Sequence, residues 1–305
     1  MTRPFRFGYQ CRALADHEVL VAEARRAEEL GYDELWTYDH IGEVDPFVPL
    51  VVAAEATTTL RIGPLVLNNE LHHPVLLART AATVDRLSGG RLTLGIGAGY
   101  AQAEHDAIGV ALRSPGERVE RMGESLRVLR DLLDDGRCAF DGAHHTIAVD
   151  DLGVRPVQPH LPLLVGGHGR RVMALAAQHA DIFQFTGLTH GEGGRPQPGG
   201  FAIGDVEQRQ RWLSEIAGDR DEHIERSALV QVTDVADDAS TRLESMAARF
   251  GLDRDELMQT PFVLIGSVGQ VVDELEGLRV RLGISHLVVR EAEAFAPVVA
   301  ALRGR

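Results

Sequence analysis

Glycine recurs at every second position after one apolar segment of this chain. Gly95, Gly97 and Gly99 follow residues 91–94, which have the composition of a strand entering a core. Alternate residues of a strand share a face, so this spacing leaves one face as bare backbone. Glycine weakens a strand unless another group must approach closely. The pattern predicts a floor for a flat ring ligand, with a glycine-rich barrel corner as the alternative.

A second glycine-rich segment joins the apolar residues 161–165 to an expected helix. It reads Gly166, Gly167, His168, Gly169 and Arg170. Backbone N–H groups at a helix start, together with the positive end of the helix dipole, favour anions such as phosphate. An adjacent arginine adds charge-assisted hydrogen bonds. The segment predicts a phosphate site, and the alternative is a turn with surface arginines.

Asp39 and His40 end another strand-like segment, residues 34–38. Together they offer a hydrogen-bond acceptor and a general acid or base, although a packed polar histidine is the simpler interpretation. His72 and His73 precede Pro74 and are expected at a helix start, and residues 144–145 are expected on a hairpin surface. No metal site is predicted. The chain has no lysine, which excludes a Schiff-base lysine and a Walker-type phosphate lysine.

The composition argues against a protein that binds nucleic acid or membranes non-specifically. The chain has 305 residues, a hydrophobic content of 44% and a formal net charge of −14. So acidic a surface opposes non-specific binding to nucleic acid and to anionic membranes. No apolar run is long enough for a bilayer span, and no signal peptide is recognised. We therefore expect a cytoplasmic protein that binds a small-molecule substrate, with two reduced cysteines.

Strand-like and helix-like segments alternate along the whole chain, which predicts a parallel sheet. Eight such units fit a (β/α)₈ TIM barrel with insertions, and a doubly wound open sheet is the alternative. We expect a single domain over residues 1–305. Residues 187–204 are rich in glycine and proline and predict a lid or insertion loop, and residues 100–115 predict a longer connection. The expected strands are 5–10, 34–38, 60–67, 91–99, 161–165, 181–185, 228–232 and 284–289.

In order and spacing, several segments of the chain together resemble the bacterial luciferase-like monooxygenase family, and in particular its coenzyme F420-dependent branch. The resemblance covers nearly the whole chain. The segments that carry it are 27–33 with Trp36, Asp39-His40, 61–67 with His73-Pro74, 85–91 through Gly99-Tyr100, 155–158, 164–167 and 264–267.

The resemblance implies a TIM barrel that forms a homodimer, with a flavin or deazaflavin ring in the barrel mouth. It implies a cis peptide within residues 64–67 and a cofactor phosphate on Gly166, Gly167, His168 and Gly169. His40 matches an active-site histidine of sugar-phosphate dehydrogenases of this branch. The glutamate that these enzymes carry after the fourth strand is replaced by Tyr100, with Glu104 further on. The lysines with which they bind the substrate phosphate are missing here, which argues against glucose-6-phosphate as the substrate. The ring is expected against Asp39, Leu65, Val66, Leu67, Asn68, Gly97 and Gly99.

Three functions are compatible with these patterns. The first is an F420-dependent oxidoreductase that transfers a hydride between deazaflavin C5 and a small organic substrate, with His40 as the proton donor or acceptor and Asp39 positioning His40 or the ring. The second is an FMN-dependent monooxygenase that uses reduced flavin and oxygen. The third is a flavin- or deazaflavin-binding protein without turnover. Oxygen consumption separates the first two, and substrate-dependent reduction separates both from the third.

Overall fold

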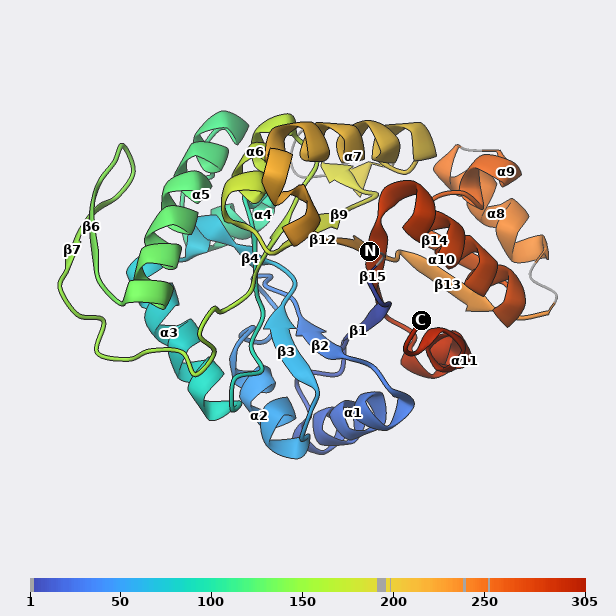
Figure 1. Ribbon diagram of the computed structural model, residues 1–305, viewed down its shortest axis with the longest axis horizontal. Helices are drawn as coiled ribbons and strands as arrows, with labels where there is room; N and C mark the ends of the chain where they lie inside the picture. The colour runs from blue at the N-terminus through green and yellow to red at the C-terminus, as the bar shows by residue number, and fades with distance from the viewer. Residues whose placement is uncertain (1–2, 191–195, 198, 238–239, 252) are drawn as a thin grey trace.

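Parallel strands form a closed barrel surrounded by helices (Figure 1). The computed structural model describes residues 3–190, 196–197, 199–237, 240–251 and 253–305. Each barrel strand pairs in parallel with its neighbours, and β1 pairs with both β2 and β15. This architecture confirms the predicted TIM barrel and excludes an open doubly wound sheet. The barrel strands are β1 (Arg6–Gln10), β2 (Glu34–Thr37), β3 (Arg61–Pro64), β4 (Leu67–Asn68), β5 (Leu94–Gly97), β8 (Leu163–Gly166), β9 (Ile182–Phe185), β12 (Glu225–Leu229) and β15 (Ile284–Val289).

The barrel closes through a strand that is split in two. The expected continuous strand over 60–67 is wrong, because β3 pairs with β2 and β4 pairs with β5, with a break at Leu65 and Val66. The peptide between these two residues is cis, within the range that the family resemblance implied. Below the break, the Ile62 amide donates to Arg91 O and the Thr93 amide donates to Ile62 O, both at 2.9 Å.

Helices follow most barrel strands, and their ends are set by local signals. Ser267 and Gln270 form a capping box at the start of α10, and Gly283 ends that helix in the left-handed conformation. Ser114 and Glu117 form a second capping box, on α5. The outer helices are α1 (His17–Leu30), α2 (Val48–Ala56), α3 (Pro74–Leu87), α5 (Pro115–Arg130), α6 (Arg170–His179), α7 (Ile203–Ala217), α10 (Val268–Leu282) and α11 (Ala292–Leu302).

Further helices and strands lie outside the barrel sheet. The expected connection over 100–115 contains a short helix, α4 (Gln102–Ile108). The expected seventh strand is shifted: the apolar run 228–232 spans the end of β12 and the start of β13, which pairs with β14 outside the barrel. The remaining elements are the hairpin β6 (Cys138–Asp141) and β7 (Thr146–Val149), the pair β10 (Thr189–His190) and β11 (Pro196–Gln197), the pair β13 (Val232–Val235) and β14 (Val263–Gly266), and α8 (Ser240–Phe250) and α9 (Arg254–Leu257).

The predicted lid at 187–204 is only partly described, since 191–195 and 198 lie outside the described residues. In the described part, β10 and β11 pair antiparallel, and Gly200 donates its amide to Gly187 O at 3.2 Å. These contacts join the two ends of the segment to each other. Its function as a lid stays a prediction.

At the bottom of the barrel, buried charges join strands from distant parts of the chain. Arg6 on β1 forms ion pairs of 2.6 Å with Glu34 on β2 and with Glu225 on β12. His286 on β15 lies 3.1 Å from Glu34. Although burial opposes ionisation, Arg6 and the other nearby cations hold the pKa of Glu34 below its usual range. This cluster ties four strands together at the end away from the glycine-rich segments.

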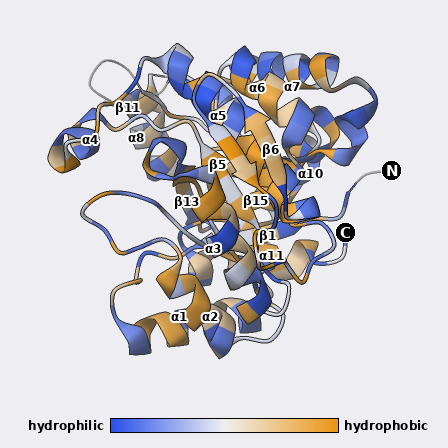
Figure 2. Cartoon of the chain, turned by 90° about the vertical axis from the view of Figure 1, so that its left-hand side faces the viewer, coloured by the Kyte–Doolittle hydropathy of each residue, from blue (hydrophilic) through white to orange (hydrophobic). Residues whose placement is uncertain are grey.

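Apolar side chains fill the space between barrel and helices. Figure 2 shows the central strands coloured largely hydrophobic, while the outer helices carry hydrophilic stretches. The fully buried side chains include Trp36, Phe7, Phe183 and Phe295. None of the helices in the described part of the chain is long and apolar enough to cross a membrane. Cys11 and Cys138 are both buried free thiols.

Candidate active site

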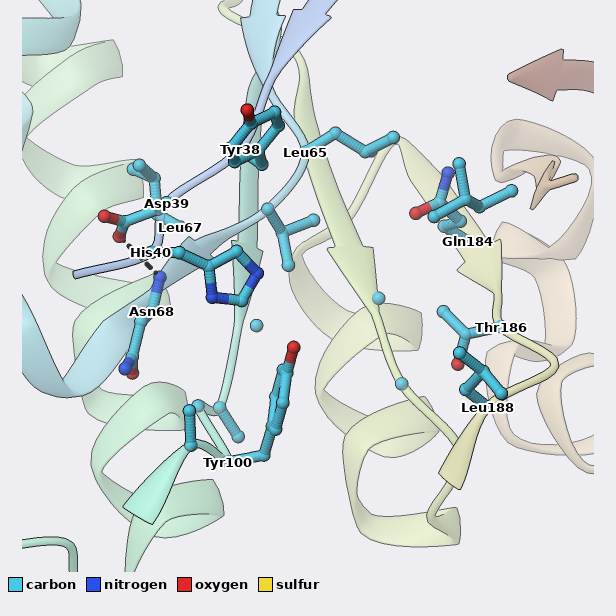
Figure 3. A pocket seen from close by; sticks show the side chains of 18 of the residues that line it. Tyr38, Asp39, His40, Leu65, Leu67, Asn68, Tyr100, Gln184, Thr186 and Leu188 are labelled. Carbon is cyan, nitrogen blue, oxygen red and sulfur yellow. Dashed lines mark hydrogen bonds between the residues drawn. The ribbon is translucent and has the colours of Figure 1, made fainter. Parts of the chain in front are cut away.

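The carboxyl ends of the barrel strands surround a cavity of about 640 Å³. In a TIM barrel this is the end at which catalytic residues gather. The close-up in Figure 3 shows His40 and Tyr100 projecting into the same space, with Gln184, Thr186 and Leu188 on the opposite side. The lining residues include Gln10, Arg12, Tyr38, Asp39, His40, Leu65, Val66, Leu67, Asn68, Gly97, Gly99, Tyr100, Glu104, Gly166, Gly167, His168, Gln184, Thr186, Leu229, Gln231 and Arg290.

His40 is held by a carboxylate from the unexpected helix α4. Its Nδ1 lies 2.7 Å from Glu104 Oε1, and the other carboxylate oxygen of Glu104 accepts the Ile41 amide at 3.2 Å. A neutral imidazole that donates its Nδ1 proton to Glu104 has Nε2 available for a substrate. The Tyr100 ring meets His40 edge to face at 6.1 Å. Burial, reinforced by the Glu104 charge, raises the pKa of the Tyr100 hydroxyl, so Tyr100 stays protonated.

Asp39 lines the cavity and belongs to a second hydrogen-bond network. Asp39 Oδ2 accepts the Asn68 amide at 2.9 Å and lies 2.8 Å from His72 Nε2. The Asn68 side-chain amide reaches His105 Nε2 at 3.1 Å, while His105 Nδ1 faces Val110 O at 3.2 Å. The carboxylate that bonds His40 is therefore that of Glu104, and the expectation that Asp39 positions the cofactor ring stays a prediction. Asp39 instead fixes the backbone of β4.

The glycines of β5 accommodate other parts of the chain. A Cβ on Gly95 would lie 2.2 Å from Pro64 O, and one on Gly97 would lie 2.8 Å from Val66 Cγ2. At Gly99, where φ is +78°, the same atom would lie 2.1 Å from Asn68 Oδ1. The segment between β3 and β4 therefore packs closely against these glycines. Gly97 and Gly99 also line the cavity, so their role as a floor for a ring stays a prediction. Leu65, Val66 and Leu67 form the wall that faces the cavity.

The glycine-rich segment after β8 is braced by a buried arginine. Arg209 on α7 is 4% exposed, and it donates to His168 Nδ1 and to Thr186 O at 2.8 Å each, and to Gly200 O at 2.6 Å. Burial lowers the pKa of Arg209 to about 10, which still leaves it charged at neutral pH. Because Nδ1 accepts a hydrogen bond, His168 carries its proton on Nε2, which faces Leu188 O and the Thr186 hydroxyl.

Arg290, which directly follows β15 and lines the cavity, is held by two side-chain amides. Its Nε donates to Gln10 Oε1 at 2.8 Å and its NH1 donates to Gln231 Oε1 at 3.1 Å. Gln10 in turn donates to Leu65 O at 3.3 Å. Burial, followed by repulsion from Arg12, lowers the pKa of Arg290. Two arginines, Arg12 and Arg290, therefore line the same cavity as His40 and Glu104.

The structure brings together most of the predicted site residues. Gly169 and Arg170 are not among the residues lining the cavity: Gly169 is the N-cap of α6, and the Arg170 guanidinium lies 6.0 Å from the Trp212 ring centre. The sequence reasoning did not assign roles to Glu104 or Arg209. No group of three or more metal-ligating side chains occurs in the part of the chain that the structure describes.

Comparison with known proteins identifies the family. Residues 6–197 match the family described as luciferase-like monooxygenase. The chain belongs to this family. Among curated relatives, it is 32% identical over 155 residues to a 5,10-methylenetetrahydromethanopterin reductase of Archaeoglobus fulgidus, which covers 51% of this chain and 45% of the relative. It is 31% identical over 195 residues to an F420-dependent glucose-6-phosphate dehydrogenase of Kineococcus radiotolerans, covering 59% and 56% respectively. The chain thus spans about half the length of these curated relatives.

Several solved structures share the whole fold. A coenzyme F420-dependent tetrahydromethanopterin reductase from Methanopyrus kandleri superimposes with a TM-score of 0.78 at 18% identity, covering 98% of both chains. An F420-dependent secondary alcohol dehydrogenase gives 0.77 at 19% identity, covering 99% of this chain and all of the other. A monooxygenase from Streptomyces bottropensis gives 0.75 at 19% identity, covering 97% and 99%. At these identities the likeness concerns the fold alone.

Proposed function

We propose that this luciferase-like protein is an F420-dependent oxidoreductase that transfers a hydride between deazaflavin C5 and a small organic substrate. The observation that carries the proposal is the hydrogen-bonded pair of His40 and Glu104 at the mouth of a cavity large enough for a ring cofactor and a substrate. The F420-dependent relatives named above support the choice of cofactor. When bound, the deazaflavin supplies the hydride chemistry, and the protein supplies placement and protons.

The residues present fit such a cofactor at two places. Leu65, Val66 and Leu67 offer an apolar wall on which a flat ring can pack. Gly166 and Gly167 lead into α6, whose first amides point out of the helix end and favour a phosphate. We include Gly169 and Arg170 in this proposed phosphate site because they begin α6, although they lie outside the cavity lining.

We assign proton transfer to His40. Glu104 accepts at Nδ1 and so orients the ring, leaving Nε2 to give a proton to a substrate oxygen or take one from it. The His40 side chain is 38% exposed, whereas the Glu104 side chain is 19% exposed. A substrate in the cavity can therefore reach the histidine, while its carboxylate partner is shielded. Tyr100 packs against the same ring and restricts water on that side.

The direct test is a parallel fluorescence titration of the purified protein with F420 and with FMN. The proposal expects micromolar or tighter binding of F420 and much weaker binding of FMN. Gly167→Asp should abolish binding, because a Cβ at this position would lie 2.8 Å from Val172 Cγ1 and the added carboxylate repels a phosphate. Gly204→Asp adds the same charge where nothing lies within 4 Å of a Cβ, and it should bind like the unchanged protein. A preference for FMN would overturn the cofactor assignment.

The second candidate is an FMN-dependent monooxygenase, which the fold shared with the Streptomyces bottropensis monooxygenase favours. It predicts oxygen consumption with reduced flavin, which a deazaflavin enzyme lacks. A protein that only binds the cofactor would show neither oxygen consumption nor substrate-dependent change in absorbance at 420 nm. A screen of alcohols, aldehydes and ketones against both redox forms of F420 therefore separates the three functions.

We further propose a cytoplasmic homodimer in which residues 1–305 form a single domain and 187–204 act as a lid over the cavity. Leu188, at the start of this segment, lines the cavity, which supports the lid. Light scattering tests the dimer, and cell fractionation tests the location. Limited proteolysis with and without F420 tests the lid, since closure should protect this segment from cleavage.

A further inference from the structure

The charged side chains around the cavity are divided between two walls. Asp39, Glu43 and Glu104 line it near β2 and β5, whereas Arg12 and Arg290 line it near β1 and β15. The proposed cofactor contacts use the ends of β2 through β8 in the barrel order. A reacting molecule must then lie against the remaining wall, where the two arginines are.

Arg290 is built to bind an anion. Both of its partners are neutral amide oxygens, and it forms no ion pair with any carboxylate in the described residues. A guanidinium has five N–H donors, and Gln10 and Gln231 occupy two of them. The other three have no partner among the described residues, so one edge of the group is left for a ligand.

The amides also fix the direction of that edge. Gln10 is 5% exposed and is itself anchored on Leu65 O, while Gln231 donates to Leu229 O at 3.3 Å. A guanidinium held on two sides is pre-organised, so little conformational entropy is lost when it forms paired hydrogen bonds to a carboxylate. Arg12, exposed at the rim with no hydrogen-bond or ion-pair partner in the described part of the chain, adds a second positive charge.

We infer that the substrate of this enzyme carries a carboxylate, which Arg290 binds through its open N–H edge with support from Arg12 while the reacting carbon faces His40. This inference rests on the proposed function for the reaction itself. One half-buried guanidinium with a single open edge matches the single charge of a carboxylate.

The test compares carboxylates with their neutral amides as probes: acetate with acetamide, lactate with lactamide, and benzoate with benzamide. Dissociation constants are measured by ligand-observed NMR at low ionic strength, on protein with and without F420. We expect at least one carboxylate to bind ten times more tightly than its amide. In Arg290→Gln the ratio should fall below three, and Arg290→Lys should retain part of it.

Arg79→Gln serves as the matched control, because it makes the same charge change on the exposed face of α3 and should leave the ratio unchanged. Equal affinities within every pair, or a ratio that survives Arg290→Gln, would overturn the inference. If methylphosphonate binds ten times more tightly than all three carboxylates, the inference of a carboxylate substrate is wrong and a phosphate substrate takes its place. Cofactor affinity, measured on the same samples, must stay within twofold in each variant. If neither F420 nor FMN binds the unchanged protein, the proposed function fails. The ratio of carboxylate to amide affinity, measured on the cofactor-free protein, then still tests the anion site at Arg290.

Discussion

Replacing Gly95 by alanine distinguishes two reasons for the glycines of β5. If they served only as a floor for a ring, an added methyl group would weaken cofactor binding and leave the empty protein stable. The structure predicts a different result, because a Cβ on Gly95 would lie 2.2 Å from Pro64 O. That oxygen belongs to the backbone, so two barrel strands would have to separate by about 1 Å to restore ordinary contact.

The size of the effect follows from this geometry. Overpacking a core typically costs about 1–3 kcal/mol, and a clash with fixed backbone places Gly95→Ala at the upper end, near 3 kcal/mol. For a chain of 305 residues, with an unfolding entropy of about 2.1 cal/mol/K per residue, that corresponds to a melting temperature lower by about 5 °C. Gly97→Ala meets only the Val66 methyl group at 2.8 Å, which can move, so we expect a loss of about 1 kcal/mol.

The assay is thermal unfolding of the cofactor-free protein, followed by circular dichroism. Gly277→Ala is the matched control: it lies within α10 with nothing within 4 Å of a Cβ, and alanine there should stabilise the helix by about 0.5–1 kcal/mol. A Gly95→Ala protein that melts within 2 °C of the unchanged protein would refute the reasoning and favour the ring-floor interpretation.

Three further predictions concern individual side chains. With a substrate found in the screen, Glu104→Gln should lower kcat by about 10–100-fold with little change in KM, because it removes a charge-assisted hydrogen bond worth about 1.5–3 kcal/mol; steady-state kinetics would contradict this if kcat stayed within twofold. Arg209→Gln should destabilise the protein to urea by about 2–4 kcal/mol, since three segments lose buried donors; an unchanged midpoint would show that the bracing is dispensable. Burial and the nearby Arg121 lower the pKa of His145 to about 4. The unfolded chain therefore binds the extra proton first as the pH falls from about 6.5 to 4, so stability should drop in that window by about 1–2 kcal/mol more than in His145→Gln, as measured by urea unfolding at each pH.

The barrel and the position of its mouth could be predicted from the sequence because strand and helix signals alternate along the chain. Asp39 and His40 could be placed at the barrel mouth because they directly follow the strand-like segment 34–38. The placement of Glu104 could not be predicted, because the short helix α4 has no side-chain N-cap bond and lies in a segment without a clear helical pattern. Proximity of Glu104 to His40 depends on how α4 packs, and spacing along the chain does not encode it.

Other differences have equally specific causes. His145 was expected on the surface because a hairpin was predicted, but it is 6% exposed, and its Nε2 lies 3.2 Å from the Ser125 hydroxyl on α5. The break in the third strand directly follows Gly63 and Pro64, a pair typical of turns. The apolar residues on both sides of this pair favoured one continuous strand over 60–67. The bracing of the segment after β8 by Arg209 joins residues about 40 positions apart, and a single sequence gives no indication of such a contact.

The pairing of β1 with β15 has a consequence for synthesis of the protein. Arg6 lies opposite His286, about 280 residues later in the chain, and both belong to the charged cluster around Glu34. During translation at about 5–20 residues per second, one edge of β1 waits on the order of 10–60 s for its partner. Until β15 is made, the Arg6–Glu34 ion pair is not covered by that strand, and the backbone N–H and C=O groups on one edge of β1 are unpaired. Such an edge can pair with the strands of other chains. We therefore expect the nascent chain to depend on chaperones until its last strand leaves the ribosome.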